Sequence, residues 1–256
     1  ARDIQQAFLP RHYPVFPRSA QPAESALTFS HLYYPSGAVG GDFFDIIRIS
    51  DTQAGIFISD VMGHGARAAL VVATIRGLVE QLSSVSHDPG AFMTQLNHTY
   101  ASIFSQAGDL MFATALYLVV DIKTGRIHYT DAGHPFPFKL SRLDGSVEEL
   151  VFTDGARGPA IGLFDDSVYK NAEAQLSASD MLLFYTDGLS EAFGDGKDYF
   201  ESGQMVGSLR ANLKNAPAQL LNNLVAGARQ FSGRADFDDD VCLLCMEISR
   251  LMEAGA

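Results

Sequence analysis

The order of short strand-like runs and paired helices is the feature that most restricts how this chain folds. Runs of β-branched and aromatic residues at 27–34, 43–49 and 54–59 are separated by Gly, Ser and Asp, which is typical of strands. Helical patterns then occupy 65–82 and 88–105. Further strands are predicted at 111–121, 126–132, 136–140, 147–151, 173–176, 181–185 and 241–248, with helices at 202–213 and 218–231. Hairpins with helix pairs inserted between them predict an α+β fold, in which antiparallel sheets pack together under covering helices.

The composition fits one compact globular domain. The chain has 256 residues, of which 47% are hydrophobic and 19% charged. Thirty acidic and 18 basic residues give a formal charge of −12. This balance argues against a nucleic acid as the main ligand, because phosphate backbones need a basic surface. It suits a protein that recruits cations, although the need for solubility also accounts for it.

The first 22 residues differ from the rest. Residues 1–9 place Ile4 and Phe8 on one helical face, which predicts a short connector helix that ends at Pro10. The Pro-rich stretch 10–22 is interpreted as an extended arm or linker outside the core. We therefore divide the chain into a connector and arm, 1–22, and a folded domain, 23–256. A first helix that simply packs on its own domain is an equally acceptable interpretation.

The two cysteines, Cys242 and Cys245, lie in the predicted last strand. Residues three apart in a strand point to opposite faces, so we expect two separate buried thiols in a reducing compartment. No apolar run approaches the length needed to span a bilayer, and no signal peptide opens the chain. These features predict a cytoplasmic protein without a membrane segment in this piece.

Several aspartates share one context, at the end of an apolar strand or just before one. Asp42 follows two glycines, Asp60 ends the run at 54–59, and Asp187 follows the run at 181–185. Asp239 and Asp240 come directly before the last strand. Any one of them is adequately explained as a turn residue that caps backbone amides. Together they predict a rim of the core that is lined with negative charge.

Crowded carboxylates repel one another, and some take up protons unless a cation neutralises them. Ligand sets made only of oxygen select hard ions such as Mg²⁺ or Mn²⁺. Two such ions about 4 Å apart can activate water and hold a phosphoryl group during in-line displacement. The aspartates therefore favour a phosphate-processing metal centre.

Five motifs in order support this interpretation: Val39-Gly-Gly-Asp-Phe-Phe-Asp45, Ser59-Asp-Val-Met-Gly-His-Gly65, Asp131-Ala-Gly-His-Pro135, Tyr185-Thr-Asp-Gly-Leu-Ser-Glu191 and Asp239-Asp-Val241. Together they resemble the signatures of the bacterial SpoIIE/RsbU-type serine/threonine phosphatases, which belong to the protein phosphatase 2C-like (PPM) superfamily. The resemblance covers about residues 26–248. It implies an α-β-β-α sandwich with two Mn²⁺ or Mg²⁺ ions bound at one edge, between the sheets.

The resemblance also implies roles for individual residues. Asp60 bridges the two ions, and the backbone carbonyl of Val61 binds one of them. Asp187 and Asp239 complete the ligands of the second ion. Asp42 is a nearby carboxylate that orients water, and Asp240 is an additional candidate ligand. In the implied reaction, hydroxide attacks phosphorus directly without a covalent enzyme intermediate.

Two departures from the eukaryotic relatives stand out. Val61 and Met62 separate His64 from the bridging aspartate, so we expect His64 to have a structural role rather than to donate a proton. Residues 33–41 contain no arginine, whereas those relatives grip phosphate with one upstream of the first acidic motif. Phosphate binding is therefore expected to depend mainly on the metals. For His134, a role in stabilising its turn is the favoured interpretation.

The resemblance further implies a phosphorylated STAS-type regulatory protein as substrate, and an upstream sensor domain in the same chain. It implies that the helix at 65–82 shifts under control of that sensor and repositions Asp42 and Asp60. A homodimer formed through the first helix is possible on the same grounds. Two alternatives stay open: a catalytically weak docking module, and a two-metal hydrolase of small phosphoesters.

Overall fold

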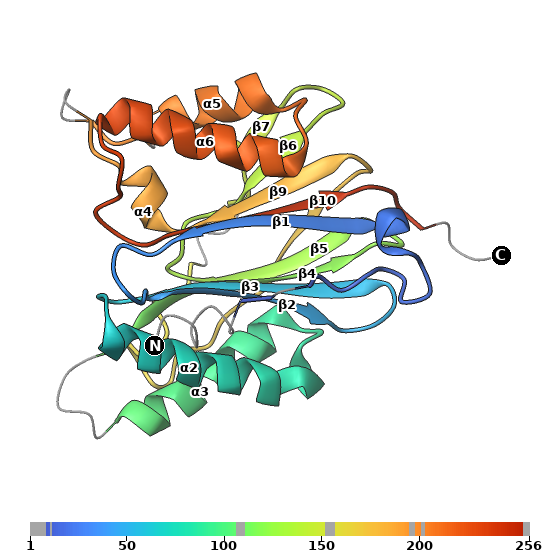
Figure 1. Cartoon of the computed structure of the whole chain (residues 1–256). Helices are drawn as coiled ribbons and strands as arrows, with labels where there is room; N and C mark the ends of the chain where they lie inside the picture. The colour runs from blue at the N-terminus through green and yellow to red at the C-terminus, as the bar shows by residue number, and fades with distance from the viewer. Residues whose placement is uncertain are drawn as a thin grey trace.

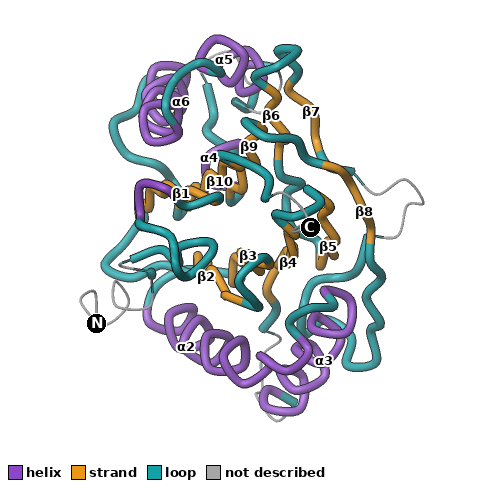
Figure 2. The backbone as a smooth tube through the Cα atoms, turned by 90° about the vertical axis from the view of Figure 1, so that its right-hand side faces the viewer, coloured by secondary structure: helices purple, strands orange, loops and turns teal. Residues whose placement is uncertain are grey.

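Two five-stranded antiparallel sheets, each covered by helices on its outer face, make up the molecule (Figures 1 and 2). The computed structural model describes residues 9–10, 12–105, 111–151, 157–194, 198–200 and 203–252. The first sheet has the order β1 (Leu27–Tyr34), β10 (Val241–Ile248), β9 (Asp180–Tyr185), β6 (Phe138–Ser141) and β7 (Val147–Glu149). The second has the order β2 (Asp42–Arg48), β3 (Gln53–Val61), β4 (Ala113–Asp121), β5 (Arg126–Ala132) and β8 (Ala172–Gln175).

The helices form the two outer layers, so the expected α-β-β-α sandwich is confirmed. Figure 2 shows one helical pair above the first sheet and the other below the second. The first pair is α5 (Gln204–Asn212) and α6 (Pro217–Ser232), and the second is α2 (Ala66–Gln81) and α3 (Pro89–Phe104). Short helical turns are η1 (Pro22–Glu24), η2 (Leu82–Val85) and α4 (Asp187–Ser190).

Local sequence signals set the ends of these helices. Asp88 caps α3 by accepting a hydrogen bond from the Ala91 amide at 3.2 Å, and Pro89 occupies the first helical turn. Gly233, with φ +66°, ends α6 in the left-handed conformation. Both boundaries lie where the sequence predicts a helix to begin or end.

Three apolar cores hold the four layers together: one between the sheets and one between each sheet and its helices. Successive strand residues point to opposite faces, so a central strand has to be apolar on both. In β10, Cys242 faces the core between the sheets and Cys245 faces the core under α5 and α6. Both thiols are free and fully buried, as the strand geometry predicts.

The Pro-rich arm differs from its prediction, because it contributes to the core. Phe16 is fully buried in the core between the sheets. Its amide donates to Ser25 Oγ at 3.0 Å, and its carbonyl accepts from the Ala26 amide at 2.7 Å. The arm therefore folds back on the domain, since one aromatic side chain fills space between the sheets. The predicted connector helix falls largely on residues 1–8, which lie outside the described residues.

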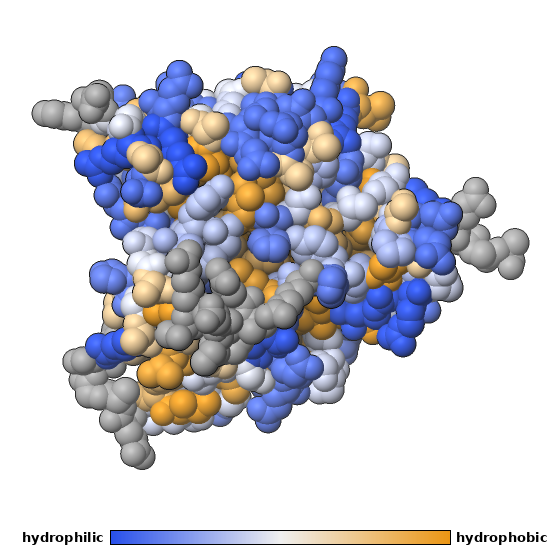
Figure 3. Space-filling model, viewed as in Figure 1, coloured by the Kyte–Doolittle hydropathy of each residue, from blue (hydrophilic) through white to orange (hydrophobic). Residues whose placement is uncertain are grey.

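One stretch corrects the expectation about apolar length. Within the described residues, Ala66–Val85 is long and apolar enough to cross a membrane by length and composition alone. It forms α2 and η2, and Val72, Ile75 and Val79 pack it against the second sheet. Its outer face is also partly apolar, since Leu70 is 72% exposed. In Figure 3, apolar residues (orange) show at the lower left, where Figure 1 draws α2.

Candidate metal centre

The site lies where both sheets end at the same edge of the sandwich. β2 begins at Asp42 and β3 carries Asp60, and the two residues are directly paired in the antiparallel register. In the other sheet, β9 ends just before Asp187, and β10 begins just after Asp239 and Asp240. On the left of Figure 1, α4 and the loop between β3 and α2 mark this edge.

Thr186 joins the two halves of the site. Its hydroxyl donates to Asp42 Oδ2 at 2.6 Å and accepts from the Cys242 amide at 2.8 Å. The Thr186 amide also donates to the carbonyl of Cys242 at 3.1 Å. A carboxylate of the second sheet is thereby bonded to a side chain that is itself fixed to the first sheet. Sequence reasoning missed this threonine, although it lies inside the motif that supplies Asp187.

The carboxylates are graded from the interior to the solvent. Asp42 is 2% exposed, Asp60 and Asp187 are half-buried, and Asp239 is exposed. Asp239 Oδ1 accepts a hydrogen bond from the Asp240 amide at 2.7 Å. The innermost carboxylate is therefore shielded from water, and the outermost one is in contact with solvent.

Burial and mutual repulsion raise the carboxyl pKa values. Burial, with Asp60 next in importance, raises the pKa of Asp42 well above its usual value, and the Thr186 bond opposes the shift. Burial, followed by the charges of Asp187 and Asp239, raises the pKa of Asp60 to about 8. Burial, then Glu191 and Asp239, raises the pKa of Asp187 to about 6. Without a cation, this cluster retains protons near neutral pH.

The candidate ligand atoms are of the type that binds a divalent cation, but their side chains do not surround a common point. Among the described residues, no group of three His, Cys, Asp or Glu side chains is arranged to hold a metal ion. Oδ2 of Asp42 accepts a hydrogen bond from the Thr186 hydroxyl. Binding would therefore require Asp60, Asp187 and Asp239 to turn toward a common point. All the candidate donors are oxygens, the ligand type that Mg²⁺ and Mn²⁺ prefer.

The backbone carbonyl of Val61 lies beside the first acidic motif. A Cβ on Gly41 would meet the Val61 carbonyl oxygen at 2.6 Å, and the Val61 amide donates to the Gly41 carbonyl at 3.2 Å. Only glycine permits this approach of two backbones next to Asp42. The second glycine of the motif therefore brings β2 against the turn that carries Asp60 and Val61.

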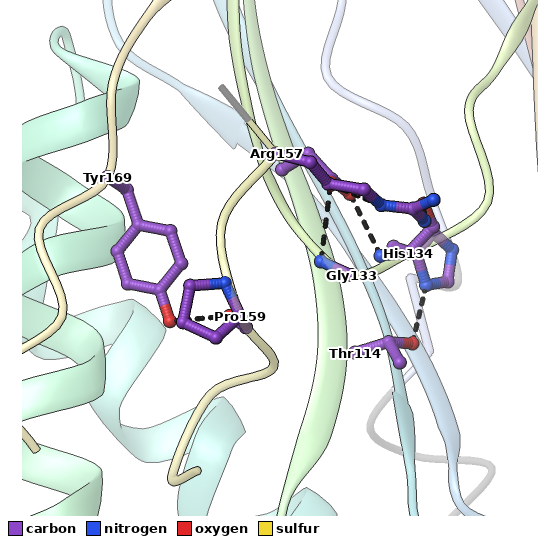
Figure 4. Close-up of polar contacts among 7 residues, drawn as sticks. Thr114, Gly133, His134, Arg157, Pro159 and Tyr169 are labelled. Carbon is purple, nitrogen blue, oxygen red and sulfur yellow. Dashed lines mark hydrogen bonds and ion pairs between the residues drawn. The ribbon is translucent and has the colours of Figure 1, made fainter. Parts of the chain in front are cut away.

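A buried turn supports the neighbouring edge of the second sheet (Figure 4). Asp131 accepts hydrogen bonds from the amides of Gly133 at 3.2 Å and His134 at 2.8 Å. Arg157 Nε pairs with Asp131 Oδ2 at 2.9 Å, and Arg157 Nη2 donates to the His134 carbonyl at 2.5 Å. His134 Nδ1 lies 2.9 Å from Thr114 Oγ1, and Thr114 is directly paired with Asp60.

This geometry gives His134 the turn-stabilising role expected for it. Burial lowers the pKa of His134 to about 3, so its imidazole is neutral at physiological pH. Burial raises the pKa of Asp131 to about 6, against the opposing charge of Arg157. No local pattern points to Arg157, because 26 residues separate it from its partner Asp131.

Two further residues differ from expectation. His64 is exposed on the loop before α2, so the structural role predicted for it has no basis in packing. Glu191, which closes the fourth motif, lies near enough to Asp187 to raise its pKa. The sequence motif alone does not indicate this influence of Glu191 on Asp187.

Comparison with known proteins agrees with the fold. Two packed antiparallel sheets covered by helices are the architecture of PP2C-type domains of known structure. Residues 50–249 match the family described as Stage II sporulation protein E (SpoIIE), and the chain belongs to this family. The resemblance stated from the five motifs is thereby confirmed.

Two relatives are similar over much of the chain. Protein IcfG of Synechocystis sp. is 27% identical over 93% of this chain and 39% of its own length. Phosphoserine phosphatase RsbP of Bacillus subtilis is 31% identical over 62% of this chain and 38% of its own length. The chain thus spans about two fifths of the length of these curated relatives.

Solved structures share the fold. The SiaA-PP2C domain of Pseudomonas aeruginosa superposes with a TM-score of 0.78 at 24% identity, over 96% of this chain and 93% of that chain. The catalytic domain of the serine/threonine protein phosphatase PstP, in complex with two manganese ions, gives 0.60 at 16% identity, over 86% and 97%.

Proposed function

We propose that this chain is the catalytic domain of a metal-dependent phosphatase that hydrolyses phosphoserine or phosphothreonine in a partner protein. One observation carries the proposal: carboxylates from both sheets meet at one edge, where burial first, and the neighbouring negative charges second, raise their pKa values. The relative RsbP is named a phosphoserine phosphatase, and PstP holds two manganese ions, which supports the same chemistry here.

The position of each residue in the site suggests its role. Asp60, at the centre of the set, would hold two Mn²⁺ or Mg²⁺ ions together with the Val61 carbonyl, Asp187 and Asp239. Bound there, the ions would supply Lewis-acid stabilisation of the phosphoryl group and an activated water. Asp42, which Thr186 holds away from solvent, would orient a water at the site.

The partner belongs to the same proposal. We infer a phosphorylated STAS-type regulatory protein as substrate, and an upstream sensor domain in the full-length protein. Dimerisation through the segment before residue 9 would allow such a sensor to act on α2. We place this activity in the cytoplasm, where the buried thiols of Cys242 and Cys245 stay reduced.

The direct test is hydrolysis of p-nitrophenyl phosphate with Mn²⁺, Mg²⁺ or a chelator. We expect turnover with metal, loss on chelation, and loss in Asp187→Asn. The variant Asp166→Asn makes the same charge change at an exposed site outside the centre and should retain activity. Activity that survives chelation, or that Asp187→Asn leaves intact, would contradict the metal mechanism.

A second assay separates the classes of substrate. A panel of phosphorylated STAS proteins is compared with small phosphoesters at equal concentration. Preference for a phosphoprotein supports the proposal, whereas efficient turnover of small phosphoesters alone indicates a small-molecule hydrolase. Tight binding of the phosphoprotein with no turnover under any metal indicates a docking module.

A further inference from the structure

One carboxylate bonds to both ends of the loop that crosses from one sheet to the other next to the site. This crossover loop, residues 35–41, connects β1 in the first sheet to β2 in the second, on the left of Figure 1. We infer that Asp240 is a positioning residue that clamps the crossover loop, and not a ligand of the metal centre. The inference rests on the proposed function for the nature of the centre.

Both carboxylate oxygens of Asp240 are already bonded. Oδ1 accepts from the Ser36 amide at 2.6 Å and from Ser36 Oγ at 2.9 Å. Oδ2 accepts from the Gly41 amide at 2.6 Å. Asp240 is 3% exposed, so these three bonds are made away from competing water. Hydrogen bonds from neutral donors to a carboxylate are stronger than neutral pairs, especially when buried.

Close packing encloses the same carboxylate. A Cβ on Gly40 would lie 2.4 Å from Asp240 Oδ2 and 2.5 Å from the hydroxyl of Tyr33. That hydroxyl is buried and has no hydrogen-bond partner within the described ranges. On the other side, a Cβ on Gly188 would lie 2.1 Å from the Asp240 carbonyl. Oδ1 thus has both lone pairs occupied, and Oδ2 is enclosed by the two glycines of the first motif.

These contacts explain what the clamp does for the site. The Gly41 amide lies one peptide before Asp42, and Asp240 follows Asp239 directly in the chain. Asp240 therefore fixes the position of Asp42, in the second sheet, relative to Asp239, at the start of a strand in the first. Coordination of a cation by Asp240 would break the bonds that hold Asp42 in place.

Counting bound ions separates a clamp from a ligand. Mn²⁺ binding is measured by calorimetry for the wild type and for the variants Asp239→Asn, Asp240→Asn and Asp238→Asn. We expect Asp240→Asn to bind as many ions as the wild type, with affinity about 10–100-fold lower, because the support of a ligand is lost. Asp239→Asn should bind one ion fewer. The exposed Asp238, which pairs with Arg234, should matter little. Loss of an ion in Asp240→Asn would overturn the inference.

A second set of variants perturbs the clamp from the opposite side, 200 residues earlier in the chain. Ser36→Ala removes one bond to Oδ1, and Gly40→Ala pushes a Cβ against Oδ2. We expect each to weaken Mn²⁺ binding without changing the number of ions. In urea unfolding, the double variant Ser36→Ala/Asp240→Asn should lose less free energy of unfolding than the sum of the losses in the two single variants. Additive losses would contradict the clamp.

The two proposals can fail separately. If the wild type binds no Mn²⁺, the proposed metal centre is wrong. Urea unfolding of the single and double variants still decides whether Asp240 clamps the loop. If the wild type binds Mn²⁺ and the cycle is additive, the clamp alone is wrong.

Discussion

At the residue scale, Thr186 shows how one hydroxyl connects two sheets. It is fully buried and serves Asp42 of the second sheet and Cys242 of the first at the same time. Burying an acidic side chain without hydrogen bonds costs free energy, so the buried carboxylate of Asp42 needs such a donor. The position of Asp42 therefore depends on the first sheet as much as on its own strand.

Thr186→Val keeps the shape of this side chain and removes its hydroxyl. Because the Cys242 amide and Asp42 both lose a partner, we expect a loss of about 1–3 kcal/mol in the free energy of unfolding. We also expect weaker Mn²⁺ binding. Thr186→Ser restores the hydroxyl and should recover most of both losses. Urea titration and calorimetry measure the effects, and a neutral result in both would refute the bridging role.

Asp60 gives a prediction about pH. Its pKa is about 8 in the folded protein and near 3.8 when unfolded, so the folded state binds the extra proton between these values. Stability of the metal-free protein should consequently fall as pH rises from about 4 through 8, by at most about 1.4 kcal/mol per pH unit for one group. Mn²⁺ should flatten this slope by neutralising the carboxylates.

The matching variant is Asp60→Asn, which cannot ionise. At pH 8 the metal-free variant should be more stable than the metal-free wild type, and it should gain little from Mn²⁺. Thermal unfolding across pH 5.5–8.5, with and without Mn²⁺, provides the measurement. If the metal-free wild type becomes more stable as pH rises, the predicted direction of the pH effect is wrong.

At the element scale, the arm before β1 behaves as part of the domain. Phe16 inserts between the sheets, and Arg48 stacks over its ring at 4.8 Å from the centroid. Tyr13 packs against Phe29, with ring centroids 5.5 Å apart. An upstream segment would therefore join the catalytic domain through a fixed element rather than through a free linker.

Phe16→Ala tests this attachment. Removal of a fully buried ring should cost about 3–5 kcal/mol in the free energy of unfolding. Val168→Ala, at a side chain that is 74% exposed, is the control and should change stability by less than about 0.5 kcal/mol. Chemical denaturation of the whole chain gives both values. Equal stability of the two variants would mean that the arm is dispensable for folding.

At the scale of the whole molecule, the site belongs to neither sheet alone. Its carboxylates come from β2 and β3 on one side and from the segments around β9 and β10 on the other. A cation bound by both sets would hold the two sheets together at this edge, because it binds the folded arrangement and not the unfolded chain.

Hydrogen exchange can detect this coupling. Addition of Mn²⁺ should slow exchange both near residues 41–43 and 60–63 and near residues 186–190 and 239–242. Peptides from α5 and β7, which lie away from the site edge, serve as internal controls and should not change. Protection confined to one sheet would indicate that the ions are held by that sheet alone.

Much of the architecture follows from local patterns. The predicted strands 27–34, 126–132 and 241–248 coincide with β1, β5 and β10, since apolar and aromatic residues recur along each run between turn residues. By contrast, α4 was not predicted, because its four residues are too few to show a helical period. The buried Phe16 was missed because proline spacing in the arm indicated a linker.

Contiguous sequence motifs are enough to predict the fold class, the family and the candidate aspartates. The support of these aspartates depends on contacts between distant segments of the chain. Thr186 reaches Asp42 across 144 residues, and Asp240 reaches Ser36 across 204. Such contacts form when two sheets pack face to face, and no local pattern encodes which hydroxyl or amide will face which carboxylate.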